Sequence, residues 1–147
     1  MAMRSKVFTY QAVLHWQGGH TASVTSGDRP ELSVTPPPDF PDGRGDRWSP
    51  EHLFLAALES CTMLSFLAHC EHNDLEVNEY SAAATGSVER RSEDQRYAFT
   101  HVNVVVSVRM APGSAQAARE LTAKAERDCF ITASTTAHIE TEWRIIE

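Results

Sequence analysis

The sequence predicts an α+β protein with the element order β-β-β-α-β-β-α-β, in which antiparallel sheets surround one long central helix. Three observations lead to this prediction. Segments rich in β-branched and aromatic residues occur in pairs with short polar connections, as in antiparallel hairpins. A long, largely apolar stretch at residues 49–70 has the start signals and length of a helix. An alanine-rich stretch at residues 114–128 predicts a second helix.

The N-terminal third predicts three strands and a loop. Residues 6–17 end at two consecutive glycines, which favour a hairpin turn, and residues 20–26 form the return strand. A shorter third strand covers residues 31–35. Four prolines and two glycines within residues 36–46 exclude regular structure there, so this segment is predicted to be a loop.

The central helix has a well-marked start. Ser49 supplies a capping hydroxyl, Pro50 fits the first helical position, and Glu51 is favoured at the positive end of the helix dipole. Apolar side chains then point around most of the circumference, and a helix of this kind must be covered on all sides. One layer of sheet does not cover it, so we expect a homodimer in which a second copy buries the remainder.

The C-terminal half predicts two long strands near residues 75–90 and 96–110, joined by a polar hairpin loop, and a last strand at residues 137–146. In the second long strand, four valines recur at every second position, which places them on one face and makes that face part of the core: Val102, Val104, Val106 and Val108.

Length and charge limit the range of functions. A chain of 147 residues is expected to form a single domain over residues 1–147. Its formal net charge of -7 disfavours binding to nucleic acid or to an anionic membrane surface. The sequence shows no signal peptide and no apolar run that approaches the length of a membrane span. We therefore expect a soluble, cytoplasmic protein with neither partner.

The three cysteines, Cys61, Cys70 and Cys129, form no CxxC motif and are too few for a disulfide framework. Cys61 and Cys70 lie nine residues apart on one helix and face opposite sides, so they cannot bond to each other. If an intrachain disulfide forms, the sequence favours Cys61 with Cys129. Cys70 is expected to be a buried, unreactive core residue.

A reactive thiol needs a group that stabilises its thiolate, and Cys61 lies too far along the helix for the N-terminal dipole to act on it. A cation must therefore come from elsewhere, and the candidates are Arg29, Arg44, Arg47, His15, His20 and His52. Cys129 follows a predicted helix C-terminus, where the dipole disfavours a thiolate, so it is expected to be a poor first nucleophile but an adequate second one.

Glu51 and Cys61 are about 15 Å apart along one straight helix, so Glu51 cannot contact that thiol within its own chain. If both residues serve one site, the helices of two subunits must pair antiparallel.

Other kinds of site, a metal centre or a serine hydrolase triad, have weaker support in the sequence. His69, Cys70 and His72 have metal-binding side chains, but only two of them share a helix face, and no metal site is predicted. No GxSxG motif appears for a serine hydrolase.

The stretch SPEHLFLAALESC resembles the helix motif of the OsmC/Ohr family, the osmotically inducible and organic hydroperoxide resistance proteins. In that motif Asn, Ser or Thr precedes Pro-Glu, and a cysteine follows ten residues after the glutamate, which here are Glu51 and Cys61. The element order is similar along nearly the whole chain, and a second family cysteine corresponds to Cys129. The resemblance implies the OsmC-like fold, in which two chains form an intertwined homodimer with two sites at the subunit interface.

The resemblance also implies a function. It identifies Cys61 with the thiolate that attacks the O–O bond of an organic hydroperoxide and becomes a sulfenic acid. Cys129 then corresponds to the resolving thiol that forms a disulfide, which an external dithiol reductant protein reduces, with no other cofactor. Glu51 corresponds to the carboxylate that orients a guanidinium beside the reactive sulfur. Such a protein is an antioxidant enzyme of oxidative-stress defence.

Two motifs depart from the family pattern and indicate a divergent branch. The hydroperoxide resistance proteins have Gly-Gly-Arg in the first hairpin, whereas this chain has His20 in place of the arginine; His20 and Arg29, from the next loop, are the candidate substrate-binding residues. The family's Cys-Pro-x-Ser is Cys129-Phe130-Ile131-Thr132 here. Two alternative functions therefore remain: a non-catalytic dimer that binds a small molecule, and a hotdog-type dimer that binds thioesters without using either cysteine.

Overall fold

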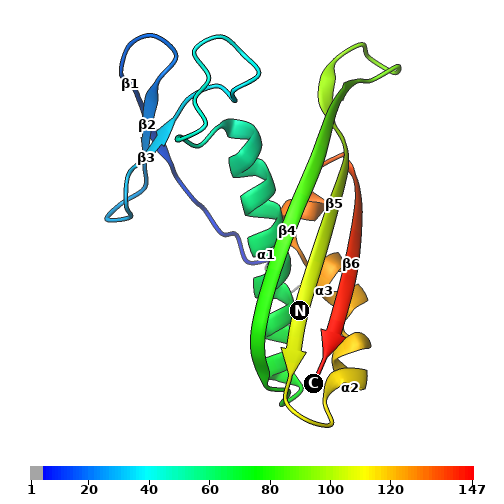
Figure 1. The fold of residues 1–147 in the computed structure, drawn as a ribbon. Helices are drawn as coiled ribbons and strands as arrows, with labels where there is room; N and C mark the ends of the chain where they lie inside the picture. The colour runs from blue at the N-terminus through cyan, green and yellow to red at the C-terminus, as the bar shows by residue number, and fades with distance from the viewer. Residues whose placement is uncertain (1–4) are drawn as a thin grey trace. The chain divides into compact units, whose positions relative to one another are not determined.

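A computed structural model describes residues 5–147 of the chain. The chain divides into two compact units, Met1–Leu53 and Phe54–Glu147, and each is described by itself. Figure 1 shows the elements in chain order, with the labels used below. The fold belongs to the predicted α+β class, with two small sheets and one long helix. The single domain expected over residues 1–147 stays a prediction.

The first unit contains the predicted three-stranded antiparallel sheet, in the order β1-β2-β3. Its strands are short: β1 Val13–Trp16, β2 Ala22–Thr25 and β3 Leu32–Val34. The glycine turn between β1 and β2 is confirmed, because Gly18 and Gly19 have φ values of 94° and 54°. Residues other than glycine rarely adopt such positive φ values.

Helix α1, Pro50–His72, begins where the sequence predicted. The Ser49 hydroxyl accepts a hydrogen bond from the His52 backbone N–H at 3.2 Å, and the Ser49 carbonyl accepts the first helical bond from Leu53 N–H at 2.9 Å. Contrary to the sequence-based expectation, α1 is long and apolar enough to cross a membrane when length and composition alone are considered. Core helices of globular proteins share this property.

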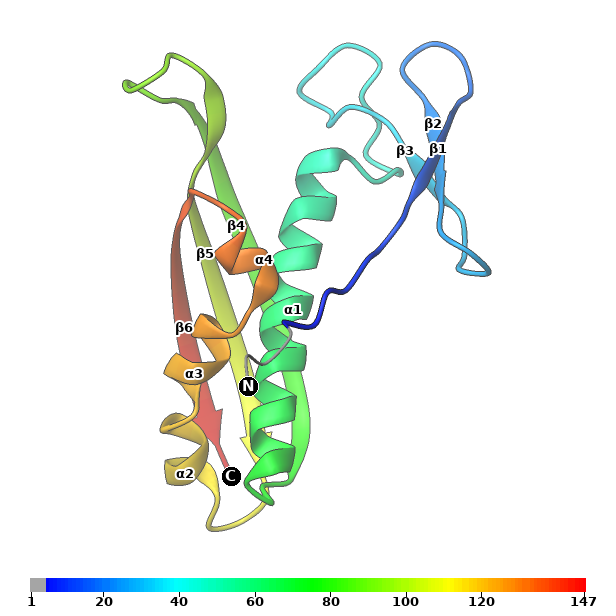
Figure 2. The same cartoon turned by 180° about the vertical axis from the view of Figure 1, so that it is seen from behind.

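The second unit contains a three-stranded sheet in the order β4-β5-β6, formed by β4 Val77–Arg90, β5 Tyr97–Met110 and β6 His138–Ile146. Alternation along β5 is as predicted: the four valines of its core face are buried, together with Met110, while His101, Asn103 and Ser107 are exposed. Figures 1 and 2 together show α1 and the later helices on the same face of this sheet.

One strand pairing differs from the prediction. β4 pairs with β5 in antiparallel orientation, as expected, but β6 pairs with β5 in parallel, with Val102 opposite Ile139 and Val106 opposite Trp143. A parallel pair needs a long crossover connection between its strands. The segment between Met110 and His138 provides one because it carries three short helices.

The second predicted helix, residues 114–128, is divided into α2 Ala115–Arg119 and α3 Thr122–Arg127. At the junction Leu121 N–H bonds to Ala118 O, a tighter i−3 pattern, and the Thr122 hydroxyl donates to Arg119 O at 2.9 Å. A further turn of helix, α4 Phe130–Ala133, follows and was not predicted.

Helix α1 buries one narrow stripe against its own unit. The fully buried residues recur at every fourth position: Leu58, Thr62, Phe66 and Cys70. Phe66 packs against Trp143 of the sheet with ring centroids 4.9 Å apart. Elsewhere on the helix apolar side chains stay accessible, and Leu64 is 61% exposed. The covering that the sequence required for this helix is therefore incomplete within the described chain.

We predict that Gly86→Ala destabilises the protein. A Cβ atom at Gly86 in β4 would lie 2.6 Å from Phe99 Cε1 and 3.0 Å from Leu55 Cδ2, and Phe99 stacks on Phe54 with ring centroids 4.6 Å apart. Overpacking of this kind lowers the free energy of unfolding by about 1–3 kcal/mol, which urea denaturation would measure. Gly45→Ala is the control, because a Cβ atom there meets nothing within 4 Å. Equal stability of the two variants would contradict the packing described here.

Candidate active site

Two of the three free thiols meet in the second unit. Cys61 projects from α1, and Cys129 lies in the segment between α3 and α4, directly before the first residue of α4. The two thiols lie close enough for each to shift the pKa of the other. Cys129 is fully buried, with 0% of its surface exposed, whereas Cys61 is partly exposed. The structure therefore brings together the pair that the sequence favoured for an intrachain disulfide.

Hydrogen-bond donors surround the sulfur of Cys129. Thr132 N–H donates to Cys129 Sγ at 3.4 Å, and Thr62 Oγ1 lies 3.7 Å from the same atom. Burial raises the pKa of Cys129, but the hydrogen bonds from Thr132, from Cys61 and from Thr62 outweigh burial and leave the pKa below its ordinary value. This sulfur is therefore the one of the pair that carries negative charge more readily.

The environment of Cys61 acts in the opposite direction. Burial raises the pKa of the Cys61 thiol, and the neighbouring Cys129 raises it further. The backbone N–H groups of Ile131 and Phe130 oppose this shift without cancelling it. Within residues 54–147, no arginine, lysine or histidine side chain forms a hydrogen bond with either thiol. The pKa of Cys61 is therefore raised, whereas that of Cys129 is lowered.

These observations correct one expectation. The sequence placed Cys129 only at the C-terminal end of a helix, where a thiolate is disfavoured. The structure places it after α3 but also at the N-cap of α4, where it accepts the Thr132 N–H. Because α4 was not predicted, the donors that favour the Cys129 thiolate were missed.

Cys70 is buried among the core residues of α1 and the sheet. Burial raises its pKa to about 11, so the thiol stays protonated at neutral pH. Cys70 thus has the environment expected of a packing residue.

Glu51 and His20, two of the predicted site residues, line one pocket of about 600 Å³ within the first unit. Its walls are mainly apolar and include Trp16, Val34 and Phe40. Among residues 5–147, Glu51 Oε2 is one of the few buried side-chain oxygens without a hydrogen-bond partner. His20 Nδ1 lies 2.6 Å from Asp42 Oδ2. The pocket thus combines an apolar wall with the side chains of His20 and Glu51.

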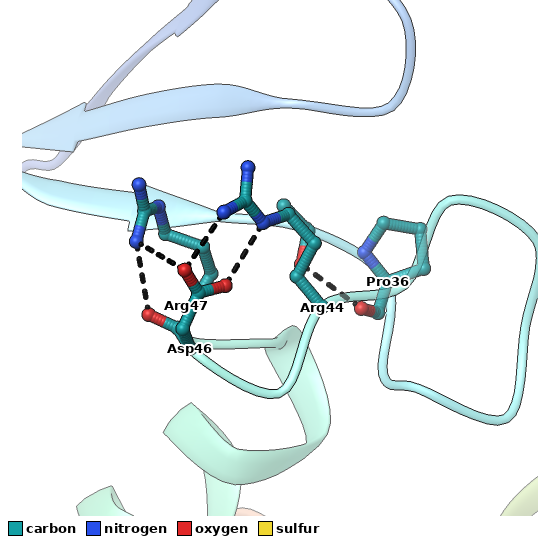
Figure 3. A network of polar contacts seen from close by, with 5 residues as sticks. Pro36, Arg44, Asp46 and Arg47 are labelled. Atoms are coloured by element: carbon teal, nitrogen blue, oxygen red, sulfur yellow. Dashed lines mark hydrogen bonds and ion pairs between the residues drawn. The ribbon is translucent and has the colours of Figure 1, made fainter.

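The candidate arginines of the first unit have other partners. Arg44 and Arg47 both bind Asp46: Arg44 makes two hydrogen bonds at 2.9 and 2.7 Å, and Arg47 makes one of 3.1 Å to the carboxylate (Figure 3). Arg29 donates to Ser26 O at 3.1 Å and does not line the pocket that contains Glu51. Its predicted role in substrate binding stays a prediction.

His69, near the end of α1, pairs with an aspartate. No group of three or more His, Cys, Asp or Glu side chains suited to a metal ion occurs in the described part of the chain. His69 Nε2 instead lies 2.8 Å from Asp128 Oδ2, and Arg127 binds the same carboxylate. The pKa of Asp128 is lowered to about 2. The hydrogen bond from Arg127 contributes most to this shift, and the hydrogen bond from His69 contributes next.

Sequence reasoning missed Thr62 and Thr132, the two residues that contact Cys129. Thr62 occupies the buried stripe of α1, one residue after Cys61, and only 3% of its surface is exposed. Thr132 lies three residues after Cys129, the spacing at which an N-cap side chain receives a backbone N–H. That spacing was visible in the sequence, but cysteine is not among the usual capping residues, and the helix itself was not predicted.

Comparison with known families and structures adds to this geometry. The family model for OsmC-like proteins matches residues 43–144, well over half of the chain. The chain belongs to the OsmC-like family. The match includes the Pro-Glu motif at the start of α1, Cys61 and Cys129. Comparison with curated protein sequences finds no match.

Solved structures share this OsmC-like fold at low sequence identity. An OsmC-like protein of unknown function from Vibrio cholerae superposes with a TM-score of 0.85 at 21% identity, covering 93% of this chain and 99% of that one. An organic hydroperoxide resistance protein from Elizabethkingia anophelis, with thiocyanate bound, superposes with a TM-score of 0.72 at 19% identity. The match covers 98% of this chain and 99% of that one. The organic hydroperoxide resistance protein OhrB of Bacillus subtilis superposes with a TM-score of 0.65 at 18% identity. The match covers 94% of this chain and 98% of that one. At this identity the likeness shows the fold alone.

Proposed function

We propose that this OsmC-like protein is a thiol-dependent peroxidase that reduces organic hydroperoxides in oxidative-stress defence. The observation that carries the proposal is the Cys61–Cys129 pair, two free thiols from different elements whose sulfurs lie within reach of each other. Two adjacent thiols can reduce a peroxide and store the oxidising equivalents as a disulfide. The hydroperoxide resistance proteins among the structural relatives support this choice of substrate.

The exposures of the two cysteine residues assign their roles. Cys61 is the partly exposed thiol, so a peroxide reaches it first; its sulfur forms a bond to one peroxide oxygen as the O–O bond breaks and the alkoxide leaves as the alcohol. The buried Cys129 then attacks the sulfenic sulfur, the S–S bond forms, and the S–O bond breaks to release water. An external dithiol reductant protein restores both thiols, and no other cofactor takes part.

The surroundings of Cys61 suit an apolar hydroperoxide. Phe130, which lies next to Cys129, is 64% exposed, and Leu64 projects from α1 one turn after Cys61. Apolar groups left in contact with water favour a substrate with a hydrocarbon body. We also propose a cytoplasmic location, because three cysteines are too few for the disulfide framework of a secreted protein.

We also propose that the working form is an intertwined homodimer. Several large apolar side chains are exposed in the single chain, on the segment that leads into β1, on β1 itself and on α1: Val7, Phe8, Tyr10, Trp16 and Leu64. Apolar surface of this extent is typical of a subunit interface. The dimer would let Glu51 of one chain serve the thiol of the other, as the helix spacing requires.

One observation favours a second function, binding of a small molecule without catalysis. The apolar pocket of the first unit is lined by two polar side chains, His20 and Glu51, among mainly apolar ones. Such a pocket suits a ligand with an apolar body and a hydrogen-bond donor. Its occupation would not require either thiol, which separates this function from the peroxidase.

We predict that one equivalent of an organic hydroperoxide converts the reduced protein to a form lighter by two hydrogen atoms, with a crosslinked Cys61–Cys129 peptide. The reason is that these two sulfurs are in reach of each other while Cys70 is buried elsewhere in the core. Intact-mass measurement and peptide mapping would detect the product.

The variants of this experiment separate the two functions. Cys61→Ser abolishes hydroperoxide consumption, and Cys70→Ser, the matched control, leaves it unchanged because that thiol is protonated and buried. Unchanged consumption by Cys61→Ser would refute the peroxidase proposal and leave the binding function.

We predict that two inactive variants restore activity when they are mixed. Glu51→Ala and Cys61→Ser each remove one half of a site. In a mixed dimer with sites shared between subunits, one site regains both residues. Unfolding and refolding an equal mixture yields about one half mixed dimers with one active site of two, so about a quarter of the wild-type rate returns. No recovery on mixing would show that Glu51 does not serve the partner's thiol.

A further inference from the structure

One polar row on α1 faces the segment that carries Cys129. The row consists of Thr62, Ser65 and His69, at positions i, i+3 and i+7, so the three side chains lie on one side of the helix. Each of them contacts either the last turn of α3 or the residues between α3 and α4. Figure 2 shows α3 and α4 beside α1. The core helix thus makes polar contacts with one short segment.

Two of these contacts hold the chain just before Cys129. The Ser65 hydroxyl donates to Ala125 O at 2.8 Å. Ala125 lies in the last turn of α3, where backbone carbonyls lack the next helical turn as a donor, so the hydroxyl satisfies a group that the helix itself leaves free. His69 Nε2 lies 2.8 Å from Oδ2 of Asp128, the residue directly before Cys129.

On the other side of Cys129 the chain has fewer contacts with the core. Helix α4 has only four residues, and none of them is fully buried. Ile131 packs against the core, but Phe130, the residue after Cys129, is 64% exposed. The placement of Cys129 against α1 therefore depends strongly on the contacts that Ser65 and His69 make before it.

We infer that Ser65 and His69 are positioning residues that hold the buried Cys129 where it attacks the sulfenic acid of Cys61, and that they thereby protect Cys61 from further oxidation. The inference rests on the peroxidase function proposed above. Neither residue touches the peroxide in this scheme. Both act through the position of the second thiol.

The sulfenic acid of Cys61 has two competing fates. In the first, the Cys129 sulfur attacks it, the S–S bond forms, and the sulfenic oxygen leaves as water with the thiol proton. In the second, a further hydroperoxide gives one oxygen to the sulfur, its O–O bond breaks, and the alcohol leaves; the sulfinic acid that remains is not restored by a dithiol. The first fate is intramolecular, so it gains from a well-held Cys129, whereas the second depends on the peroxide concentration.

The first test measures how the two fates compete. Reduced protein is treated with excess organic hydroperoxide without reductant, and intact mass separates the disulfide from the sulfinic acid, which is heavier by two oxygen atoms. Ser65→Ala should raise the ratio of sulfinic acid to disulfide about fivefold, the factor of one ordinary hydrogen bond. His69→Leu should raise it about threefold, because its pair with Asp128 is partly exposed. The rate at which the first equivalent of hydroperoxide is consumed should not change.

Conservative variants and neighbours on the same helix are the controls. Ser65→Thr and His69→Gln keep a hydrogen-bond donor and should restore the wild-type ratio. Ser60→Ala removes a hydroxyl that donates to Ala56 O within α1, and His72→Leu removes an exposed imidazole. Neither of these two should change the ratio. A slower first turnover with an unchanged ratio in Ser65→Ala and His69→Leu would assign the two residues a packing role and overturn the inference.

The second test uses no hydroperoxide. When the reduced Cys70→Ser protein is equilibrated with glutathione disulfide, each Cys61–Cys129 disulfide that forms releases two glutathione thiols. The equilibrium constant reports the effective concentration of one thiol at the other. Adding Ser65→Ala should lower this constant about fivefold and His69→Leu about threefold, as in the first test.

The outcomes distinguish the inference from the function on which it rests. Unchanged glutathione constants together with an unchanged sulfinic fraction would overturn the inference and leave the peroxidase function intact. Absence of hydroperoxide consumption by the wild-type protein would refute the peroxidase function, and the protection of Cys61 with it. The glutathione constants would then still decide whether Ser65 and His69 position Cys129.

Discussion

The packing of one stripe of α1 against the β4–β5–β6 sheet determines the geometry of the thiol site. Burial at every fourth residue fixes the rotation of the helix about its axis, because Leu58 and Phe66 must both face the core. That rotation turns Thr62 inward and sets Cys61, one residue earlier, at the edge of the buried region. The reactive thiol owes its partial exposure to this rotation.

The same stripe explains why the two sulfurs differ. Burial alone disfavours a thiolate at both positions, so the hydrogen-bond donors decide which sulfur carries charge. The buried Thr62 hydroxyl and the first turn of α4 deliver their donors to Cys129. Cys61 receives backbone contacts from Phe130 and Ile131, which do not cancel the effect of its burial. The two thiols therefore differ in their hydrogen-bond donors, and this difference is the physical basis for giving them different roles in the reaction.

Much of this fold could be predicted from sequence because its signals are local. The cap at Ser49, the glycine turn before β2 and the valine alternation of β5 depend on neighbouring residues only, and all three are confirmed. The parallel pairing of β6 and the break between α2 and α3 were missed, because they depend on contacts between distant segments and on a competing hydroxyl at Thr122. The pairing of Cys61 with Cys129 was expected from position, but the order of their acidities was not, since it depends on α4.

The central claim is that Cys61 reacts with the peroxide and that the buried Cys129 then forms the disulfide with it. The most direct measurement locates the oxygen atom: a cyclic dione that traps sulfenic acids is added in excess with one equivalent of organic hydroperoxide, and the adduct is mapped by peptide mass spectrometry. The account predicts the adduct on Cys61 and none on Cys129, which has no exposed surface. An adduct on Cys129 would contradict it, because the buried sulfur would then be the one that attacks.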